Sequence, residues 1–277
     1  MQGKTVVITG ATSGIGEVAA VALARAGARI VMVARDAARA DVTMARLAGQ
    51  GHTVHLADLS RLSEMKRVAA EIAARETRID VLINNAGALF NTREVTEDGL
   101  EKTFATNHLA YFVMTALLLP RLKATPGARI VSTASDAHRG AKLDFADLQS
   151  ARRYSGFSVY GRSKLMNILF TRELARRLDG SGVTANCLHP GFVATRFGDR
   201  SGGIMSVAIR MAKPFAGLSP EKGAETIIHL ASSPDVANVS GQYFYKRKIA
   251  TPTAEAQDDE SAKRLWDETA KIAGLDI

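Results

Sequence analysis

A tyrosine and a lysine stand four positions apart, at Tyr160 and Lys164, in a segment of helical period. Near the start of a helix this spacing places the phenol and the ammonium on one face. A phenol has a pKa near 10, so acid–base work near pH 7 requires its phenolate to be stabilised by about 3 pKa units, or ~4 kcal/mol. One positive charge ~4 Å away supplies about that much at an effective dielectric constant near 20. The pair is therefore a candidate proton-transfer site, with a plain surface pair as the alternative.

A glycine-rich turn precedes the first expected helix, within a strand–turn–helix unit. Such a turn presents backbone N–H groups and the positive end of the helix dipole to a pyrophosphate. Its spacing, G-x-x-x-G-x-G, departs from the G-x-G-x-x-G dinucleotide fingerprint, so an ordinary tight turn is the alternative. The residues that we expect to bind a nucleotide here are Gly10, Thr12, Ser13, Gly14, Ile15 and Gly16.

The second apolar strand runs into Ala34, Arg35 and Asp36. In an NAD-binding protein an acidic residue at this place reads the ribose 2′-hydroxyl. Ala34 offers no acceptor, whereas the Arg35 guanidinium is a planar cation suited to a 2′-phosphate. The sequence therefore favours NADP(H) over NAD(H), with Asp36 as the cap of the next helix and a solvated Arg35 as the alternative. Asp58, with Leu59 beside it in the candidate nucleotide site, either binds the adenine amino group or caps the helix that follows.

The elements that must position these residues alternate along the chain, and no linker divides them. Near-continuous apolar strands in such an order indicate a parallel sheet with helices on both faces and a ligand beyond the carboxyl ends of the strands. We expect an α/β protein: a single Rossmann-type domain, residues 1–277, with a doubly wound parallel sheet of about seven strands. The expected strands are Thr5–Thr9, Arg29–Val33, Thr53–Leu56, Val81–Asn84, Ala128–Thr133, Val183–Leu188 and Gln242–Tyr245. The expected helices are Ile15–Ala26, Ala37–Ala48, Leu62–Thr77, Thr96–Thr106, Leu109–Lys123, Val159–Asp179, Pro220–Ala231 and Ser261–Ile272.

Three further motifs follow in order at the spacing of βα units. Asn84-Asn85-Ala86-Gly87 comes after the fourth strand, Asn107 lies in the next helical region, and the fifth strand leads to Ser135. Together with the glycine-rich turn, Tyr160 and Lys164, these motifs make the chain resemble the short-chain dehydrogenase/reductase family over essentially its whole length.

The resemblance implies hydride transfer between a nicotinamide and a carbonyl or alcohol. Tyr160 would act as general acid in reduction and general base in oxidation, and Lys164 would bind the nicotinamide ribose and lower the Tyr160 pKa. Ser135 would hydrogen-bond the substrate oxygen, and Asn107 would hold a proton-relay water. By the same likeness, the residues that line the cofactor are Asn85, Ala86, Gly87, Tyr160, Lys164, Pro190, Gly191, Val193 and Thr195.

A narrower likeness concerns the region around the catalytic tyrosine. Ser135 and Tyr160 are 25 positions apart, and the segments Asp144–Leu148 and Tyr160–Phe170 are similar to those of the retinol dehydrogenase and WW-domain oxidoreductase branch. His138, three residues after Ser135, is open to two interpretations: a contact to the substrate or a local role in the turn. Family likeness also implies a homodimer or homotetramer, for which the helices at 109–123 and 159–179 have apolar surface to spare.

Residues 192–218 hold neither strand nor helix period for long and are rich in Gly, Met and Phe. A long irregular segment inside a compact domain is usually functional, so we expect a substrate lid here, with an amphipathic helix packed on the domain as the alternative. Met and Phe side chains suit a lipophilic aldehyde or ketone of variable shape.

Composition narrows the remaining classes. The 277 residues are 46% apolar and 23% charged, which excludes disorder, and with Cys187 as the one cysteine no intramolecular disulfide can form. We expect a cytoplasmic protein with no signal peptide and no membrane span, because the longest apolar stretch, Leu109–Leu119, is shorter than the ~20 residues required. The formal charge of +8 is spread along the chain, so no nucleic acid is expected, and without metal-ligand spacing no metal is expected.

Two alternatives keep the same fold and change the function. The chain could bind NADP(H) as a sensor or scaffold without turnover, but a sensor has no need of the acid and its lysine. It could also act on a sugar nucleotide by epimerisation or dehydration. Such relatives carry a larger carboxyl-terminal domain, and little chain follows Lys164.

Overall fold

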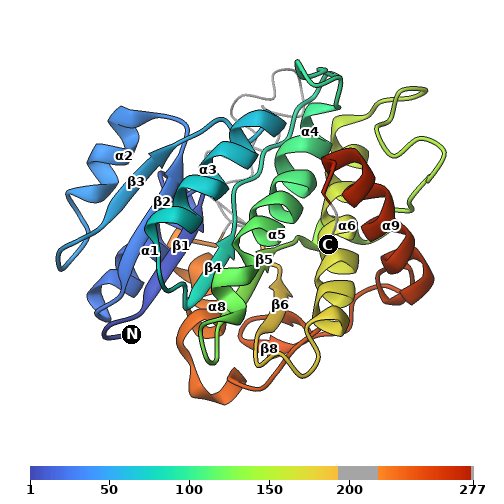
Figure 1. Ribbon diagram of the computed structural model, residues 1–277. Coiled ribbons are helices and arrows are strands. Elements are labelled where there is room, and N and C mark those ends of the chain that lie inside the picture. The colour runs from blue at the N-terminus through green and yellow to red at the C-terminus, as the bar shows by residue number, and fades with distance from the viewer. Residues whose placement is uncertain (193–217, 276–277) are drawn as a thin grey trace.

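The computed structural model describes residues 1–192 and 218–275 and consists of one twisted sheet between two layers of helices (Figure 1). The strands of this eight-stranded sheet lie in the order β3-β2-β1-β4-β5-β6-β7-β8. All neighbouring strands are parallel except β7 and β8. The strands are β1 Thr5–Thr9, β2 Arg29–Ala34, β3 Thr53–Leu56, β4 Val81–Asn84, β5 Arg129–Thr133, β6 Thr184–Leu188, β7 Tyr243–Tyr245 and β8 Lys248–Ile249. The α/β, doubly wound fold predicted from the sequence is confirmed, with one more short strand than expected.

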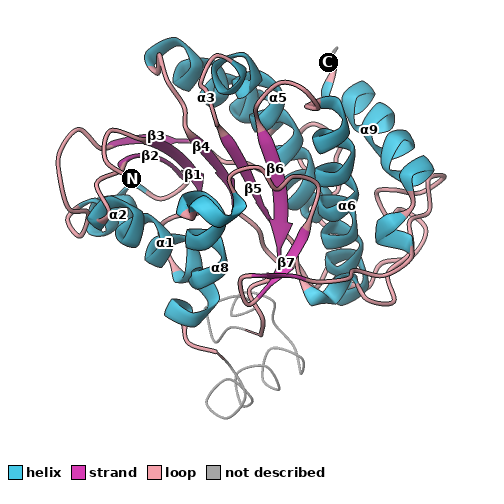
Figure 2. Cartoon of the chain, turned by 90° about the horizontal axis from the view of Figure 1, so that it is seen from below, coloured by secondary structure: helices cyan, strands magenta, loops and turns pink. Residues whose placement is uncertain are grey.

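The helices cover both faces of the sheet, as Figure 2 shows. One face packs on α1 and α8 through a core that includes Ile8, Leu23 and Ile227. The other packs on α3, α5 and α6 through a core that includes Leu82 and Phe112. The helices are α1 Gly14–Arg25, α2 Ala37–Met44, α3 Leu62–Arg75, α4 Lys102–Phe104, α5 Ala110–Lys123, α6 Gly156–Arg177, α8 Pro220–Ser232 and α9 Asp259–Ala273.

The strand order reverses between β1 and β4. The chain adds β2 on one side of β1 and later adds β4 on the other side. In open α/β sheets, ligands bind in the crevice outside the carboxyl ends of the strands at such a point. The fold therefore brings the glycine-rich turn after β1 next to the loop after β4, where the sequence predicted a nucleotide.

Two expectations from the sequence need correction. The helix expected over Thr96–Thr106 begins only at Lys102, because a turn at 96–100 precedes it and the Glu101 carboxylate caps the new helix by accepting from the N–H groups of Thr103 and Phe104. The antiparallel strand β8 was not expected at all. It follows a two-residue hairpin turn in which Lys246 and Arg247 both have positive φ, and such turns are normally signalled by Asn and Gly.

The carboxyl-terminal helix α9 packs against α6 and α5 (Figure 1). Its residues Ala262, Leu265, Trp266 and Thr269 are buried on one face. The Trp266 ring stacks on Phe170 with ring centroids 5.8 Å apart, and it meets Phe112 edge-on at 4.9 Å. Part of the apolar surface that the sequence offered to a partner is therefore covered by the chain itself.

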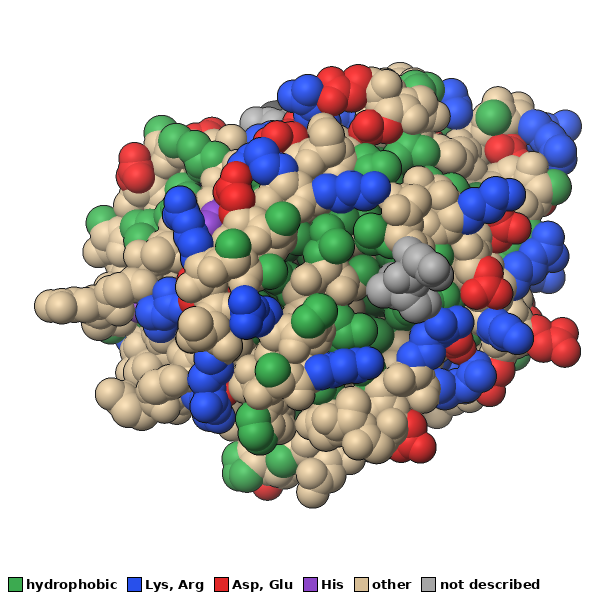
Figure 3. Space-filling view, viewed as in Figure 1, with side chains coloured by type: hydrophobic (Ala, Val, Ile, Leu, Met, Phe, Trp, Pro, Cys, Tyr) green, Lys and Arg blue, Asp and Glu red, His purple; other side chains and the backbone are tan. Residues whose placement is uncertain are grey.

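The face seen in Figure 3 carries apolar side chains at its centre, over α5, with Lys and Arg spread among Asp and Glu around them. The expected homodimer or homotetramer stays a prediction. Within residues 1–192 and 218–275 every helix is too short or too polar to cross a bilayer.

Candidate active site

The glycine-rich turn after β1 is packed too tightly for side chains at two of its glycines. Gly10 has φ +70°, and a Cβ atom there would lie 2.8 Å from the Cα atom of Ala86. A Cβ atom on Gly16 would lie 2.4 Å from Nδ2 of Asn85 and from the carbonyl oxygen of Gly10. The turn and the loop after β4 thus touch backbone to backbone.

The side chains of Thr9 and Asn85 join the ends of three strands. Oγ1 of Thr9 accepts hydrogen bonds from the N–H groups of Asn85 and Ala86, both at 3.0 Å. Nδ2 of Asn85 donates to the carbonyl oxygens of Thr9 and Gly10 at 3.2 Å, and its Oδ1 accepts from Oγ1 of Thr133 at 3.3 Å. The Asn85 amide is therefore engaged in holding the crevice together, and its contact with a cofactor stays a prediction.

The amino terminus of α1 fits a phosphate-bearing group. Ser13 is the N-cap residue, but its side chain makes no capping hydrogen bond and is exposed. The N–H groups of the first turn, at Gly14, Ile15 and Gly16, therefore lack the partner that a capping side chain normally supplies. With the partly buried Thr12 beside them, these groups match the donors that hold a pyrophosphate.

The end of β2 separates the roles of Arg35 and Asp36. Oδ1 of Asp36 accepts from the N–H group of Arg39 at 3.1 Å and caps α2, as the sequence indicated. Arg35 is exposed, and no carboxylate within the described residues pairs with it. Its guanidinium is therefore available to an anionic ligand, and its contact with a 2′-phosphate stays a prediction.

Asp58 lies in the turn between β3 and α3. Its Oδ1 accepts from the N–H group and the hydroxyl of Ser60 at 3.0 and 2.9 Å. Asp58 thus holds its own turn and does not cap α3, whose first N–H group donates to Asp98 instead. The capping alternative is therefore wrong, and contact with adenine stays a prediction. The Leu59 side chain is buried in the core, which leaves only its backbone to meet a nucleotide.

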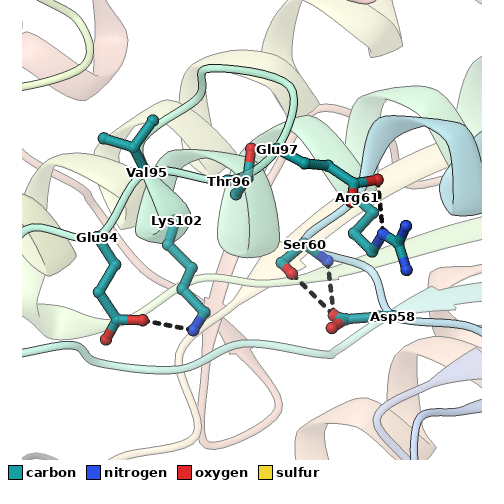
Figure 4. Close-up of a pocket in the computed structure, with 8 residues that line it drawn as sticks. All are labelled: Asp58, Ser60, Arg61, Glu94, Val95, Thr96, Glu97 and Lys102. Atoms are coloured by element: carbon teal, nitrogen blue, oxygen red, sulfur yellow. Dashed lines mark hydrogen bonds and ion pairs between the residues drawn. The ribbon is translucent and has the colours of Figure 1, made fainter.

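A polar pocket of about 230 Å³ opens beside Asp58 (Figure 4). Its charged side chains form two ion pairs, Arg61 with Glu97 at 2.7 Å and Lys102 with Glu94 at 2.6 Å. The pocket contains none of the four predicted catalytic residues. Both of its cations are therefore paired with carboxylates, and its fifth charged side chain, Asp58, accepts from Ser60.

Ser135 and Tyr160 meet at the carboxyl end of β5. Ser135 begins the one-turn helix η2 (Asp136–His138), where its Oγ accepts from the N–H group of Ala137 at 3.2 Å. The Tyr160 side chain, in the second turn of α6, makes a hydrogen bond with Ser135. Burial raises the pKa of Tyr160 to about 12, and this hydrogen bond acts in the opposite direction. The phenol is therefore protonated at neutral pH.

Lys164 lies one turn further along α6, buried between Tyr160 and Tyr111. Its Nζ is 5.5 Å from the Tyr160 ring centroid and 5.7 Å from that of Tyr111. Burial lowers the pKa of Lys164 to about 7. Burial is therefore the largest cause of both pKa shifts. It raises the pKa of Tyr160, whereas the sequence predicted that Lys164 would lower it. A Cβ atom on Gly87 would lie 3.4 Å from Nζ, so the loop after β4 reaches the pair.

Asn107 lies in η1 (Ala105–Leu109), a π-helical turn that leads into α5. Its Nδ2 donates to the carbonyl oxygen of Ala88 at 2.9 Å and to Oγ of Ser163 at 3.0 Å, and its Oδ1 accepts from the Ala88 N–H group at 2.8 Å. The Asn107 carbonyl oxygen accepts from Nδ2 of Asn167 at 2.9 Å. The side chain therefore ties the loop after β4 to α6, and the water-holding role stays a prediction.

Asn167 belongs to this site, although the sequence did not single it out. Besides the Asn107 carbonyl, its Nδ2 contacts the carbonyl oxygen of Thr133 at 3.3 Å. Its Oδ1 lies 3.4 Å from Nδ1 of His108, whose Nε2 lies 3.0 Å from Oγ1 of Thr269 in α9. A lone amide inside the apolar run of α6 was the signal that could have revealed this buried network.

The loop after β6 closes the crevice on the far side of β5. Gly191 has φ +85°, follows Pro190, and packs against Leu218 and Tyr245. The N–H group of Leu218 donates to the carbonyl oxygen of Phe192 at 2.7 Å. Val193, Thr195 and all but the two end residues of the expected lid, 192–218, lie outside the described residues.

Comparison with known proteins agrees with this geometry. Residues 4–202 match the family model for short chain dehydrogenases, and the chain belongs to that family. Human retinol dehydrogenase 13 is 41% identical over 283 residues, which cover 99% of this chain and 86% of the relative. The protein is therefore an oxidoreductase of CH–OH and C=O groups, in the branch that resembles the retinol dehydrogenases.

Two solved structures share the fold and part of the sequence. An uncharacterized protein from Mycobacterium paratuberculosis has a TM-score of 0.81 at 32% identity, over 99% of this chain and 95% of the other. A short-chain dehydrogenase from Burkholderia cenocepacia, solved in complex with NADP, has a TM-score of 0.70 at 27% identity, over 88% and 96%. The family assignment favours turnover over the alternative of a sensor.

Proposed function

We propose that this protein reduces a lipophilic aldehyde or ketone with NADPH, with Tyr160 as the general acid. The observation that carries the proposal is the meeting of Ser135, Tyr160 and Lys164 at the carboxyl end of β5, beside the loop after β4. The reduced nicotinamide supplies the hydride. The Ser135 hydroxyl holds the substrate oxygen, and the Tyr160 phenol delivers its proton to that oxygen.

The protonation of the pair is consistent with the role of Tyr160 in reduction. A phenol whose pKa burial raises to about 12 holds its proton at neutral pH and is ready to donate it. Oxidation would require the phenolate and hence a charged Lys164 beside it, but burial lowers the Lys164 pKa to about 7. The pair is thus in the form that starts a reduction, and the direction itself follows from NADPH, which cells generally hold reduced.

Support for NADP(H) comes from the end of β2. Asp36, the acidic residue nearest to the expected ribose, already caps α2, whereas Arg35 is exposed without an ion-pair partner among the described residues. A free guanidinium favours a phosphate over a hydroxyl at this place.

Support for a lipophilic substrate comes from two exposed aromatic side chains. Phe157 lies one helical turn before Tyr160 and is 58% exposed, and Phe192 follows the Pro190-Gly191 turn and is 52% exposed. Each stands within three positions of a predicted site residue, which is our basis for proposing an apolar substrate.

Turnover assays with a panel of carbonyls test the proposal. The wild-type protein is incubated with NADPH or NADH and with aliphatic, aromatic, retinoid and steroid aldehydes and ketones, and cofactor absorbance is followed. We expect bulky apolar carbonyls to be reduced with a kcat/KM at least about tenfold higher for NADPH, a difference of ~1.4 kcal/mol. Tight NADPH binding without turnover, on carbonyls or on the alcohols with NADP⁺, would instead support the sensor.

A further inference from the structure

His138 is completely buried, and each of its ring nitrogens faces one backbone group. Nδ1 lies 2.7 Å from the carbonyl oxygen of Ser135, and Nε2 lies 3.3 Å from the backbone nitrogen of Thr253. A backbone N–H group can only donate, so Nε2 must be the acceptor, and Nδ1 then carries the proton that it donates to Ser135. Both contacts are thus made by one neutral tautomer.

These two contacts join segments far apart in sequence. Ser135 begins the turn η2 after β5, whereas Thr253 lies between β8 and the one-turn helix η4 (Glu255–Gln257) that precedes α9. The Tyr243 ring on β7 meets the imidazole edge-on, with ring centroids 5.3 Å apart. The imidazole is therefore a brace between the end of β5 and the carboxyl-terminal segment.

The turn that His138 braces is pressed directly against the catalytic helix. A Cβ atom on Gly161 would lie 2.5 Å from the carbonyl oxygen of Ala137, so α6 touches η2 backbone to backbone next to Tyr160. The Ser135 carbonyl accepts from both the N–H group and Nδ1 of His138, and the Ser135 side chain is then left to meet Tyr160.

We infer that His138 is a positioning residue, which fixes the Ser135 hydroxyl against Tyr160 through its bond to the Ser135 carbonyl. It does not contact the substrate, because the ring is fully buried and both nitrogens are engaged. The inference rests on the proposed function, since it assigns His138 to the reaction that Ser135 and Tyr160 carry out.

Two substitutions separate the two ring contacts. His138→Asn places an amide N–H group near the position of Nδ1 and keeps the bond to Ser135. His138→Gln reaches toward Thr253 and loses the bond to Ser135. We expect the Asn variant to keep kcat within about threefold and the Gln variant to lose about ten- to a hundredfold, with the KM for NADPH unchanged, because a small misplacement of a catalytic group is costly.

A double-mutant cycle with Ser135→Ala shows whether His138 acts through Ser135. If it does, His138→Gln lowers kcat much less in the Ser135→Ala background than in the wild type, because the group that it positions is already gone. The same loss in both backgrounds would overturn the inference, and so would a folded Asn variant that loses kcat as severely as the Gln variant.

His52 provides a matched control. Its Nδ1 accepts from the Ile30 N–H group and its Nε2 lies against the Ala48 carbonyl oxygen, both at 3.0 Å, so it is also a histidine between two backbone groups. We expect His52→Gln to keep kcat. If His138→Gln does not fold, as judged by thermal unfolding, the retained kcat of His138→Asn carries the test. A wild-type protein without any turnover would contradict the proposed function itself, a result distinct from the others.

Discussion

The ammonium nitrogen of Lys164 donates a hydrogen bond to the carbonyl oxygen of Thr133, 3.0 Å away at the end of β5. The same oxygen accepts from Nδ2 of Asn167 at 3.3 Å and from the Tyr111 hydroxyl at 3.5 Å. Thr133 stands two residues before Ser135. The strand that leads to the serine therefore also anchors the lysine beneath Tyr160, and the sheet itself sets the geometry of the proton-transfer pair.

Arg35→Ala tests the basis of cofactor preference. Loss of the guanidinium removes a charge-assisted contact to the 2′-phosphate, so we expect the KM for NADPH to rise by about tenfold or more and the KM for NADH to change by less than about threefold. Steady-state assays with both cofactors measure the two shifts. The control is Arg39→Ala, one turn further on, whose side chain pairs with Asp36. Equal losses for both cofactors in Arg35→Ala would show that Arg35 does not read the phosphate.

The burial of His108 predicts that the protein loses stability in acid. Burial lowers its pKa to about 4 from an ordinary value of 6.5. Between pH 6.5 and 4 His108 binds a proton in the unfolded chain but not in the folded protein. The contribution of His108 to the free energy of unfolding is therefore complete above pH 6.5. It falls as the pH drops through this window, by up to about 3 kcal/mol. Urea unfolding at several pH values measures the slope. His108→Gln has no such titration, and an unchanged slope in this variant would contradict the assignment.

Trp266→Ala tests the role of α9. The indole fills the space between Phe112 and Phe170, so its removal leaves a cavity in the contact between α9 and the two central helices. We expect a loss of about 3–5 kcal/mol in the free energy of unfolding, measured with urea. Trp266→Phe retains an aromatic ring and should cost less. A loss below about 1 kcal/mol in the Ala variant would mean that α9 contributes little to the fold.

The sequence predicted the strands well for a physical reason. β1, β3 and β4 are short apolar runs bounded by Gly, Asp or Asn, and their ends match the structure residue for residue. The strand β8 was not predicted, because Lys246 and Arg247 adopt the positive φ values of a hairpin turn, which their residue types disfavour. Their positive φ values depend on the hydrogen bond from the Arg247 N–H group to Thr226 and on pairing with β7, which local sequence cannot reveal.

The site was foreseen only in part. The sequence spacing of reactive side chains predicted a site at Tyr160, Lys164 and Ser135, and the fold brings these three residues together. The turn role of His138 beside Ser135 was one of the two interpretations that the sequence left open. Asn167, in contrast, contacts a backbone group more than thirty positions away, and His138 also contacts one more than one hundred positions away. Such long-range contacts form only when the sheet and helices are assembled, so the spacing of residues in the sequence does not predict them.

The central claim is that Tyr160 donates the proton. Tyr160→Phe removes one oxygen atom and leaves the ring that packs on Lys164, so we expect NADPH binding, measured by calorimetry, to be retained. We expect kcat for carbonyl reduction to fall by about a thousandfold or more, because a positioned general acid contributes on that order. Tyr243→Phe is the control, since the Tyr243 hydroxyl has no hydrogen-bond partner among the described residues, and it should keep kcat. A Tyr160→Phe variant that reduces the same carbonyl within about tenfold of the wild-type rate would contradict the account.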